Sequence, residues 1–497
     1  MVINQLINDQ LTNLSVHPME KYIDIHIHPA LKPYSKSFSK GKINSKNRND
    51  KHSVWYYNPP TLLDKGLNYF GGLTKFSQSD FTTLAKGNFG LVCVSLYPIE
   101  RGFLVPKKIG TGLASDILAN MVMEIGKERV DYVQARKDYF ADVEGEYEYY
   151  RQLHGIKLKL NRDDHYQYRL VKSFGEIQEN ETSPDNIISV IVTLEGGHAF
   201  DTGLGKDNAP ESKVLANVKK AKNWEFRPFF VTLAHHFYND LVGHCASLAP
   251  VLTGLLDQKK GIGEGFTDLG WKVLDLLLDN TDGKRIFIDI KHLSPLARKQ
   301  YFNHLDTKYA GQIIPVIISH GAVNGLHSPE EPVVKIPSSH GMFNSGDINF
   351  YDVEFLELAK RGGLIGIQMD ERRLGDEALI KQMNGKVFRR KILYYRSQLF
   401  WNQVRHIAEV LDGAGYFGWG IQSLGTDFDG VVDPLNGYWT SEDLTYLDDY
   451  LLKHAYNYMN AEGKNLKQAS NRTIDPEEIV SRVMTDNAYM FLKKYFV

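Results

Sequence analysis

The 497-residue sequence contains few cysteines and no long apolar run. Its two cysteines, Cys93 and Cys245, are too few for a disulfide framework and form no Cys-x-x-Cys pair. This usage fits a reducing compartment. No apolar stretch reaches the roughly 20 residues needed to cross a bilayer, and the N-terminal stretch lacks the basic and apolar regions of a signal peptide. We therefore expect a cytoplasmic protein that does not use a membrane as a partner.

The sequence also lacks an excess of charge of either sign. Lysine and arginine number 58, aspartate and glutamate number 60, and the formal net charge is -2. This balance gives no electrostatic reason to expect nucleic acid or an anionic membrane as a partner. Hydrophobic residues make up 42% of the chain, which is enough to bury a large core. We expect the partner to be a small-molecule substrate.

Eight short apolar runs recur along the chain, and at least five of them end in a histidine or a carboxylate. Such runs are too short for helices and are typical of buried parallel strands. They occupy residues 22–29, 89–98, 187–198, 226–236, 285–292, 313–320, 363–370 and 416–430. Amphipathic helical segments lie between most of them, for example at 270–280, 353–361 and 396–415. This alternation predicts a closed α/β barrel of the (β/α)₈ type, with an open doubly wound sheet as the alternative.

Two stretches are too long to be simple connections between a strand and a helix. Residues 30–87, after the first strand, indicate an ordered loop insertion. Residues 100–186, after the second strand, contain a predicted long helix at 115–140. Both insertions leave the barrel where active sites are built, so they are candidates either for pocket walls or for packing alone. We expect residues 1–497 to form a single barrel domain carrying these two insertions.

Candidate metal ligands lie at the ends of the first and third runs. His26 and His28 are two residues apart, so in a strand their rings face the same side and can hold one cation. Glu195 precedes Gly196 and Gly197, which let the backbone turn sharply. Because a carboxylate has two oxygens, Glu195 can bridge two cations. The carboxyl ends of all strands of a parallel barrel meet at one rim, so these residues are expected to lie together.

Two further histidines extend this set. His292 ends the fifth run and His320 ends the sixth, and together with Glu195 they would hold a second cation. Imidazole and carboxylate ligands favour zinc, although manganese, cobalt or iron also bind such sites. Cations held in this way would activate water for attack on a substrate. The sequence therefore predicts two divalent metal ions, with zinc as the preferred one.

Catalytic candidates follow the fourth and eighth runs. Asp427, in the loop GTDFDG, is suited to carry a proton from the attacking water to the leaving group. We interpret Asp429, two residues further on, as a structural residue of that loop. Either His235 or His236 could polarise the scissile carbonyl or bind the developing oxyanion, and the period of the strand does not decide between them.

Several other polar residues receive no catalytic role from the pattern. Lys291 alternates to the outer face of its strand, so we interpret it as packed or solvated rather than as a carboxylated bridge between metals. His198, His244 and His327 are expected in exposed loops or in outer positions around the site.

Taken together, these motifs resemble the membrane dipeptidase (renal dipeptidase) family of the amidohydrolase superfamily. Five pieces occur in the family's order at strand ends, and they are LEGGH (194–198), TLAHHFYN (232–239), DIKHLS (289–294), PVIISHGA (315–322) and GTDFDG (425–430). The tail at 485–496 is similar to the family's closing helix. The resemblance implies a binuclear zinc barrel that hydrolyses dipeptides, often as a homodimer.

The resemblance also implies individual roles. Glu195 matches the family's bridging glutamate, and His292 and His320 match the histidines of the second metal. His235 matches the histidine that contacts the substrate, and Asp427 matches the catalytic aspartate. His26 matches the histidine of the first strand.

The chain departs from the family pattern at two places. The family has His-x-Asp on the first strand, where this chain has His28 in place of the aspartate. The family also places an arginine after the histidine of the sixth strand to hold the substrate's carboxylate. Here the stretch 321–350 has no arginine, and Lys335 is its only lysine. Arg372 or Arg373, after the seventh run, could supply another clamp.

The sequence as a whole predicts a zinc-dependent hydrolase that cleaves an amide bond in a small dipeptide-like substrate. One alternative is the same machinery acting on an N-acyl amino acid or a lactone. A second alternative is a metal-bound barrel without turnover.

Overall fold

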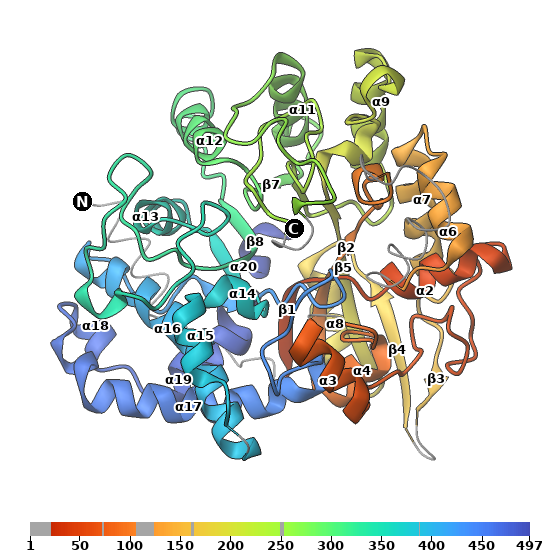
Figure 1. Ribbon diagram of the computed structural model, residues 1–497. Coiled ribbons are helices and arrows are strands. Elements are labelled where there is room, and N and C mark those ends of the chain that lie inside the picture. Colours follow the sequence, from red (N-terminus) through yellow and green to blue (C-terminus); the bar gives the residue numbers. More distant parts are fainter. Residues whose placement is uncertain (1–20, 72–73, 106–123, 161–163, 249–252, 387) are drawn as a thin grey trace.

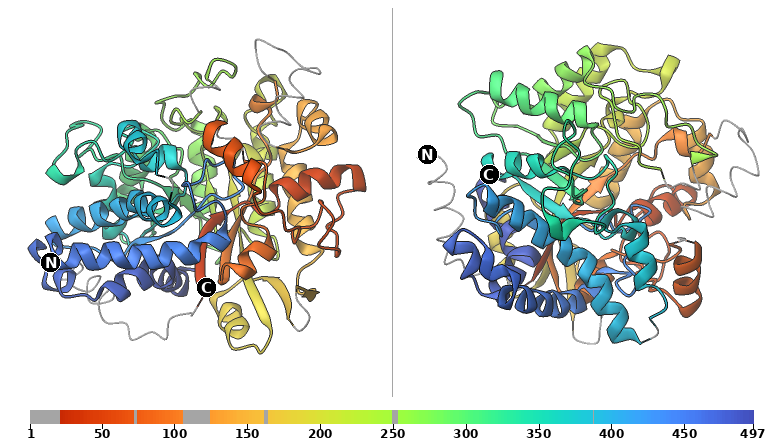
Figure 2. Two further views of the ribbon diagram at one scale, coloured as in Figure 1. Left: turned by 60° about the horizontal axis from the view of Figure 1, so that its bottom comes forward. Right: turned by 60° about the vertical axis from the view of Figure 1, so that its left-hand side comes forward.

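The computed structural model describes residues 21–71, 74–105, 124–160, 164–248, 253–386 and 388–497. Within these residues eight parallel strands close into a barrel surrounded by helices (Figures 1 and 2). The strands are β1 (Tyr22–Ile27), β2 (Phe89–Leu96), β5 (Asn186–Glu195), β6 (Phe230–Thr232), β7 (Phe287–Asp289), β8 (Ile317–Gly321), β9 (Leu364–Ile367) and β10 (Gln422–Leu424). Pairing of β2 with β5 closes the ring, which confirms the predicted (β/α)₈ barrel and excludes the open sheet.

The barrel strands are apolar because both of their faces are covered. Every residue of β2 is buried, and so is every residue of β5 after Asn186. A strand that packs against side chains on both faces reads as a continuous apolar run, which explains why the sequence pattern located it. The register is equally informative, since Glu195 pairs with Thr232 and Thr232 pairs with Asp289. Three neighbouring strands therefore end at the same level.

Helices form the outer layer and cover the barrel (Figure 1). Those of the barrel wall are α9 (Glu211–Lys222), α11 (Asp268–Leu278), α12 (Pro295–Thr307), α13 (Asp352–Lys360), α16 (Arg389–Gly413) and α20 (Asn487–Tyr495). Smaller or peripheral helices are α14 (Glu371–Leu374), α15 (Glu377–Met383), α17 (Leu444–Asn460), α18 (Ala469–Arg472) and α19 (Pro476–Ser481). The predicted helices at 270–280, 353–361 and 396–415 correspond to α11, α13 and α16.

Local sequence determines where these helices begin. The side chain of Thr267 accepts a hydrogen bond from the backbone of Gly270 at the start of α11. Ser294 does the same for Ala297 at the start of α12, where Pro295 occupies the first turn. Hydroxyl caps satisfy the free N–H groups of a first turn, and proline is tolerated there because it has no N–H to leave unpaired.

In its described residues, the first insertion contains three short α-helices and one 3-10 helix, Ser37–Lys40, and it packs beside the strand ends. The α-helices are α2 (Leu31–Lys36), α3 (Leu62–Gly71) and α4 (Phe81–Lys86). The second insertion contains α6 (Lys127–Gln134), α7 (Tyr139–Arg151), β3 (Leu158–Lys159), β4 (His165–Leu170) and α8 (Phe174–Glu181). β4 pairs in parallel with the first half of β5, and β3 pairs antiparallel with β4, so the insertion widens the sheet beyond the barrel.

The prediction of one long helix at 115–140 is wrong in the part that the structure describes, and residues 115–123 lie outside it. The chain leaves helical conformation between Gln134 and Tyr139. Asp138 then caps the next helix, because its side chain accepts a hydrogen bond from Ala141 N at 2.8 Å. An aspartate that captures a free backbone N–H starts a new helix more readily than it continues an old one.

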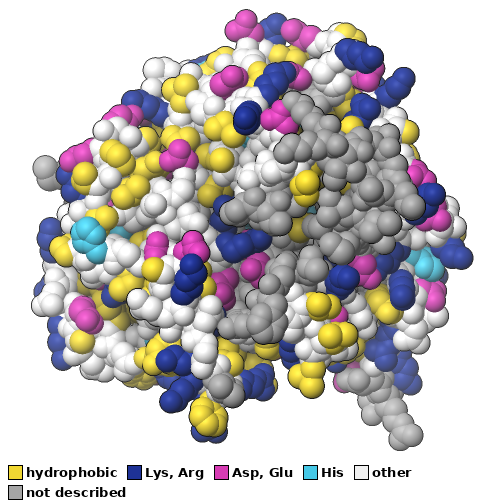
Figure 3. Space-filling model, viewed as in Figure 1, with side chains coloured by type: hydrophobic (Ala, Val, Ile, Leu, Met, Phe, Trp, Pro, Cys, Tyr) yellow, Lys and Arg dark blue, Asp and Glu magenta, His cyan; other side chains and the backbone are white. Residues whose placement is uncertain are grey.

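The surface carries charges of both signs. On the face in Figure 3, lysine and arginine side chains alternate with aspartate and glutamate side chains, in keeping with the net charge of -2. Among the helices of the described ranges, none combines the length and the apolar character needed to span a bilayer. Cys93 and Cys245 are both buried and unpaired.

Candidate metal centre

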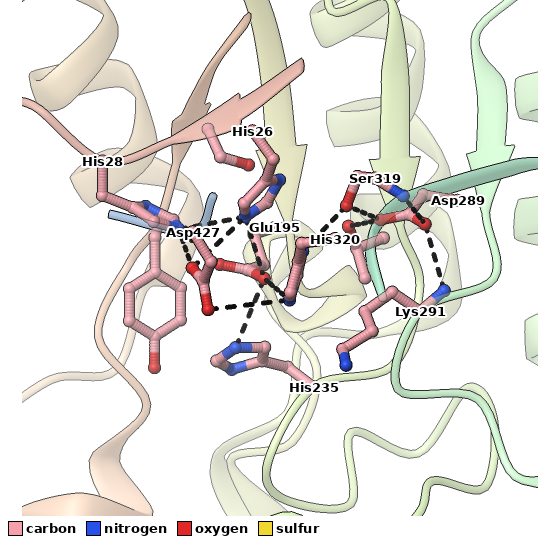
Figure 4. Close-up of polar contacts among 12 residues, drawn as sticks. His26, His28, Glu195, His235, Asp289, Lys291, Ser319, His320 and Asp427 are labelled. Carbon is pink, nitrogen blue, oxygen red and sulfur yellow. Dashed lines mark hydrogen bonds and ion pairs between the residues drawn. The ribbon is translucent and has the colours of Figure 1, made fainter. Parts of the chain in front are cut away.

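The five predicted metal ligands meet at the carboxyl end of the barrel, and Figure 4 shows four of them, His26, His28, Glu195 and His320. The Nε2 atoms of His26, His28, His292 and His320 lie 3.4, 2.9, 3.9 and 3.6 Å from a carboxylate oxygen of Glu195. All five side chains are at most 6% exposed. Residues separated by almost 300 positions therefore share one small volume, as the strand-end argument requires.

Three sets of side chains could each hold a cation. They are His26, His28 and Glu195; His26, His320 and Asp427; and Glu195, His235 and His292. In each set the ligand atoms lie within 4.8 Å of one another. The first set is the predicted one. The predicted grouping of His292 with His320 is not among the sets found in the described residues, because His292 lies with His235 and His320 lies with His26.

The chemistry of the cluster fits divalent cations. Oε1 of Glu195 is buried and has no hydrogen-bond partner in the described residues. Nε2 atoms of four histidines nevertheless surround it at 3.4 to 3.9 Å, from His26, His235, His292 and His320. A buried oxygen without a donor is costly, and imidazole nitrogens around a carboxylate are the ligands that zinc prefers. A cation among these atoms would satisfy all of them.

Protonation states in the cluster are set by burial and by neighbouring charge. Burial alone would raise the pKa of Glu195, but the adjacent His235, His26 and His28 hold it well below its usual value. Burial and neighbouring positive groups lower the pKa values of His292 and His320 well below the ordinary histidine value. An ionised carboxylate and neutral imidazoles are the forms that bind a cation.

His28 differs from His292 and His320 in the direction of its pKa shift. Burial lowers its pKa, but its contacts with Glu195 and Asp427 outweigh this effect and raise the pKa to about 10. Binding of a cation at His28 therefore competes with a proton, so the metal affinity of this set should rise with pH.

Buried carboxylates behind the ligands hold the strand ends in place. Asp24 accepts hydrogen bonds from Thr426 N and Oγ1 at 3.1 and 2.7 Å and from His26 N at 3.1 Å. Asp289 accepts a hydrogen bond from Ser319 Oγ at 2.6 Å, and Ser319 Oγ also lies 2.9 Å from Nδ1 of His320. Supports of this kind orient metal ligands.

The sequence reasoning missed these two carboxylates. A signal was present for Asp24, because it alternates with His26 and His28 along β1 and so shares their face. Asp289 had a weaker signal, as a lone acid within an apolar run that ends at a histidine three positions later.

Two residues of the site have backbone conformations that are unusual for their type. His292 and Asp427 adopt φ angles of +66° and +60°, in the left-handed region that favours glycine. Non-glycine residues are held there only when surrounding contacts fix them, and such positions cluster at functional sites. The side chain of Asp427 is 17% exposed, and its Oδ1 lies 3.4 Å from Nε2 of His28.

The structure distinguishes between the two histidines after β6. His235 points its Nε2 toward Glu195 at 3.5 Å, while its Nδ1 lies 2.6 Å from Oε2 of Glu100. His236 instead lies 2.7 Å from Ser247 Oγ through its Nδ1. His235 is therefore the member of the pair that belongs to the cluster.

Asp429 anchors its loop to the first insertion, as interpreted from the sequence. Its carboxylate accepts hydrogen bonds from Lys32 Nζ at 3.0 Å, from Gln78 N at 3.0 Å and from Ser79 N at 2.8 Å. These contacts join two segments about 350 residues or more apart in sequence. The loop that carries Asp427 is thereby fixed to the insertion that flanks it.

Lys291 does not lie on an outer, solvated face. It is 2% exposed, and its side chain runs from the end of β7 toward the space beside His320 and His235 (Figure 4). Burial, followed by the positive charge of Arg373, lowers its pKa to about 8. Strand alternation failed here because β7 ends at Asp289, whose Oδ1 accepts a hydrogen bond from Lys291 N at 3.0 Å and turns the chain.

The expectation of exposed or outer positions holds only in part for the remaining histidines. His198 and His244 are buried. Nε2 of His198 lies 2.7 Å from Pro98 O, behind the cluster, and His244 contacts the carbonyls of Cys245 and Lys260. His327 is partly exposed and lies 3.8 Å from Glu331.

Known structures share this fold. A metallopeptidase described as dipeptidase AC, of family M19, aligns with 96% of this chain and 99% of its own at 12% identity, with a TM-score of 0.53. A Rhodobacter sphaeroides metallopeptidase solved with a phosphinate mimic of the dipeptide L-Ala-D-Ala aligns with 96% of this chain and 99% of its own at 13% identity, with a TM-score of 0.53. A probable dipeptidase from Pseudomonas aeruginosa aligns with 99% of this chain and 98% of its own at 12% identity, with a TM-score of 0.50. No family model and no curated protein sequence matches the chain. The likeness is thus one of fold over nearly the whole length.

Proposed function

We propose that this protein is a metal-dependent hydrolase that cleaves the amide bond of a small dipeptide-like substrate with the help of two divalent cations. The observation that carries the proposal is the buried carboxylate of Glu195, which has an unpartnered oxygen and four histidine nitrogens around it. The shared fold with proteins described as dipeptidases supports the choice of substrate class.

The proposed ligand assignment is the one predicted from the sequence. His26, His28 and Glu195 would hold one cation. His292 and His320 would hold a second one together with Glu195, although His292 is grouped with His235 in the cation sets. Zinc suits this donor set best. When bound, such cations lower the pKa of water and polarise a carbonyl group.

Asp427 is suited to move the proton. Its side chain is 17% exposed, against at most 6% for the candidate ligands, so it can reach a substrate while it contacts the cluster. In the proposed reaction it accepts the proton that water loses on attacking the carbonyl carbon. It then gives this proton to the amide nitrogen as the C–N bond breaks.

His235 is suited to bind the carbonyl oxygen. Glu100 fixes its Nδ1 at 2.6 Å, so that Nε2 faces the cluster. Burial lowers the pKa of His235, but the carboxylates of Glu195 and Glu100 outweigh burial and raise it. A protonated Nε2 could donate a hydrogen bond to the oxygen as negative charge develops on it.

The lack of an arginine in the stretch 321–350 favours a second candidate function. The stretch 321–350 offers only Lys335 as a lysine or arginine, and this side chain is 47% exposed and paired with Glu331 at 2.6 Å. Without a cation from this stretch to hold a free carboxylate, the same machinery could act on an N-acyl amino acid or a lactone.

The test combines metal analysis with turnover. The purified protein is loaded with zinc, its metal content is measured, and it is assayed on dipeptides, N-acyl amino acids and lactones beside the variant Glu195→Gln. Dipeptide turnover that Glu195→Gln loses supports the leading proposal. Activity on the other acyl compounds alone supports the second function. Bound zinc without any turnover overturns both in favour of a non-catalytic barrel.

A further inference from the structure

Lys291 is a buried cation whose Nζ has no hydrogen-bond or ion-pair partner among the described residues, and the carboxylates of Asp427 and Asp289 act on it only from a longer distance. Lys291 is 2% exposed. Its side chain extends toward the space beside His320 and His235 (Figure 4). A buried ammonium is costly unless an anion accepts its hydrogen bonds. The unpartnered ammonium of Lys291 therefore lies beside the metal cluster, where a substrate would bind.

A second cation lies over the same region. Arg373 follows β9, and its Nη2 donates a hydrogen bond to Ser247 O in the loop after β6. In the sheet, β7 and β8 lie between β6 and β9. The loop after β6 lies beside the end of β7, since Cys245 N donates a hydrogen bond to His292 O at 2.9 Å, and Arg373 joins this loop from the end of β9. Ser247 Oγ in turn lies 2.7 Å from Nδ1 of His236, so this bridge reaches the edge of the cluster.

Arg373 adds to the need of Lys291 for an anion. Arg373 is the charged group that acts most strongly on Lys291, and its charge is of the same sign. In the described residues the side chain of Arg373 is hydrogen-bonded only to a neutral carbonyl. Arg372 takes both oxygens of Asp370 at 2.9 and 2.6 Å, so Asp370 acts on Arg373 through its charge alone. Like charges gathered in a buried place repel each other unless an anion lies between them.

We propose that Lys291 and Arg373 form the subsite that binds the substrate's carboxylate. This inference rests on the proposed function and deepens it, because it identifies the substrate as one with a free carboxylate near the scissile bond. Lys335 is excluded by its exposed ion pair with Glu331, and Arg372 by its bidentate contact with Asp370. Lys291 directly precedes His292 in the turn after β7, so a bound carboxylate would lie close to the metal ligands.

The experiment compares free acids with their amides. The variants Lys291→Met and Arg373→Met remove one charge each while keeping a side chain of similar length. Lys335→Met serves as the matched control, because it removes an exposed cation outside the subsite. For each protein, the zinc content and the circular dichroism spectrum are recorded first. Then kcat and KM are measured for a dipeptide and for the same dipeptide with a C-terminal amide.

The wild type should prefer the free acid over the amide by about 10- to 100-fold in kcat/KM, the range expected for hydrogen bonds to a charged group. Lys291→Met and Arg373→Met should lose most of this preference, mainly through a higher KM for the acid. Their loss of kcat/KM should be smaller for the amide than for the acid. Lys335→Met should keep the wild-type preference. A folded, zinc-loaded Lys291→Met that keeps the full preference would overturn the inference.

A binding measurement separates this inference from the proposed function. Calorimetric titrations with N-acetylalanine and with N-acetylalanine amide need no turnover. If the wild type hydrolyses no dipeptide but binds the acid more tightly than the amide, and Lys291→Met loses that difference, the subsite stands and the dipeptidase proposal fails. If the wild type binds both compounds equally, or binds neither, the subsite is refuted.

Discussion

Oε2 of Glu100 lies 2.6 Å from Nδ1 of His235 and fixes the direction of its ring. The other oxygen, Oε1, accepts a hydrogen bond from Phe237 N at 2.9 Å. Burial would raise the pKa of Glu100, but the charge and hydrogen bond of His235 outweigh it and lower the pKa to about 2. An ionised Glu100 therefore holds a proton on Nδ1 of His235, and the raised pKa of this ring favours a second proton on Nε2, which faces the cluster.

Replacing Glu100 with glutamine should weaken catalysis without unfolding the protein. The amide keeps the size of the side chain but removes the charge that orients His235, and losses of 10- to 100-fold are typical for such supports. The test is a pH profile of kcat/KM for Glu100→Gln and the wild type. A positioning role predicts that the limb due to His235 moves to lower pH, because a neutral neighbour no longer raises its pKa. A uniform loss at every pH would speak against this role.

Glu195→Gln should lose most of the bound zinc. The carboxylate of Glu195 belongs to two of the three cation sets and links His28 to His235 and His292. An amide in its place is a much poorer ligand. We expect activity to fall by more than about 100-fold, beyond the range of supporting residues. Metal analysis after dialysis measures the effect directly. Glu211→Gln, which alters an exposed pair with Lys272, is the matched control and should keep its zinc.

Asp427→Asn should separate metal binding from proton transfer. The amide cannot carry a proton between water and a leaving amine, so kcat should fall by about 10²- to 10⁴-fold. The sets that contain Glu195 do not include Asp427, and zinc should therefore remain bound. A variant that loses zinc together with its activity would show that Asp427 acts chiefly as a ligand.

Acid should destabilise the second insertion through Asp142. Its carboxylate contacts Arg129 at 2.6 and 2.8 Å and Arg136 at 2.7 Å. Burial opposes ionisation, but the two guanidinium groups outweigh it and lower the pKa to about 2, from 3.8 in the unfolded chain. The folded state therefore binds this proton less readily than the unfolded state. The resulting stability of about 2 kcal/mol is present above about pH 4 and is lost as the pH falls toward 2.

Urea unfolding of Asp142→Asn at several pH values tests this assignment. At neutral pH the variant should lose about 3–5 kcal/mol of unfolding free energy, because two buried guanidinium groups lose their counter-charge. The fall in stability between about pH 4 and 2 should also become shallower than in the wild type. Asp131→Asn, at an exposed position on α6, should behave as the wild type does. An unchanged slope in Asp142→Asn would refute the assignment.

Much of the barrel could be predicted because its strands are buried on both faces. The run at 89–98 corresponds to β2 (Phe89–Leu96), and the polar residues at the ends of the other runs do meet at one rim. β4 was missed, since it lies within a polar insertion and its apolar residues, Tyr166, Tyr168 and Leu170, alternate with polar ones. A pattern this short is easily outweighed by its surroundings.

The details of the site required coordinates for two physical reasons. Alternation of side chains holds only while the chain remains a strand, and Lys291 lies beyond the end of β7. Contacts between distant segments have no local signal either. Nothing around Glu100 in the sequence points to His235, although their contact determines which of two adjacent histidines joins the cluster.

The anchoring of Asp429 to Lys32, Gln78 and Ser79 has a consequence for protein engineering. Loop exchange is a common way to alter the specificity of a barrel enzyme, and the first insertion would be an obvious segment to graft or delete. Removing the first insertion would leave the buried carboxylate of Asp429, two positions from Asp427, without these hydrogen-bond partners. A successful graft would have to retain a lysine and the two backbone N–H groups that receive Asp429, or replace the aspartate with an apolar residue in the same step.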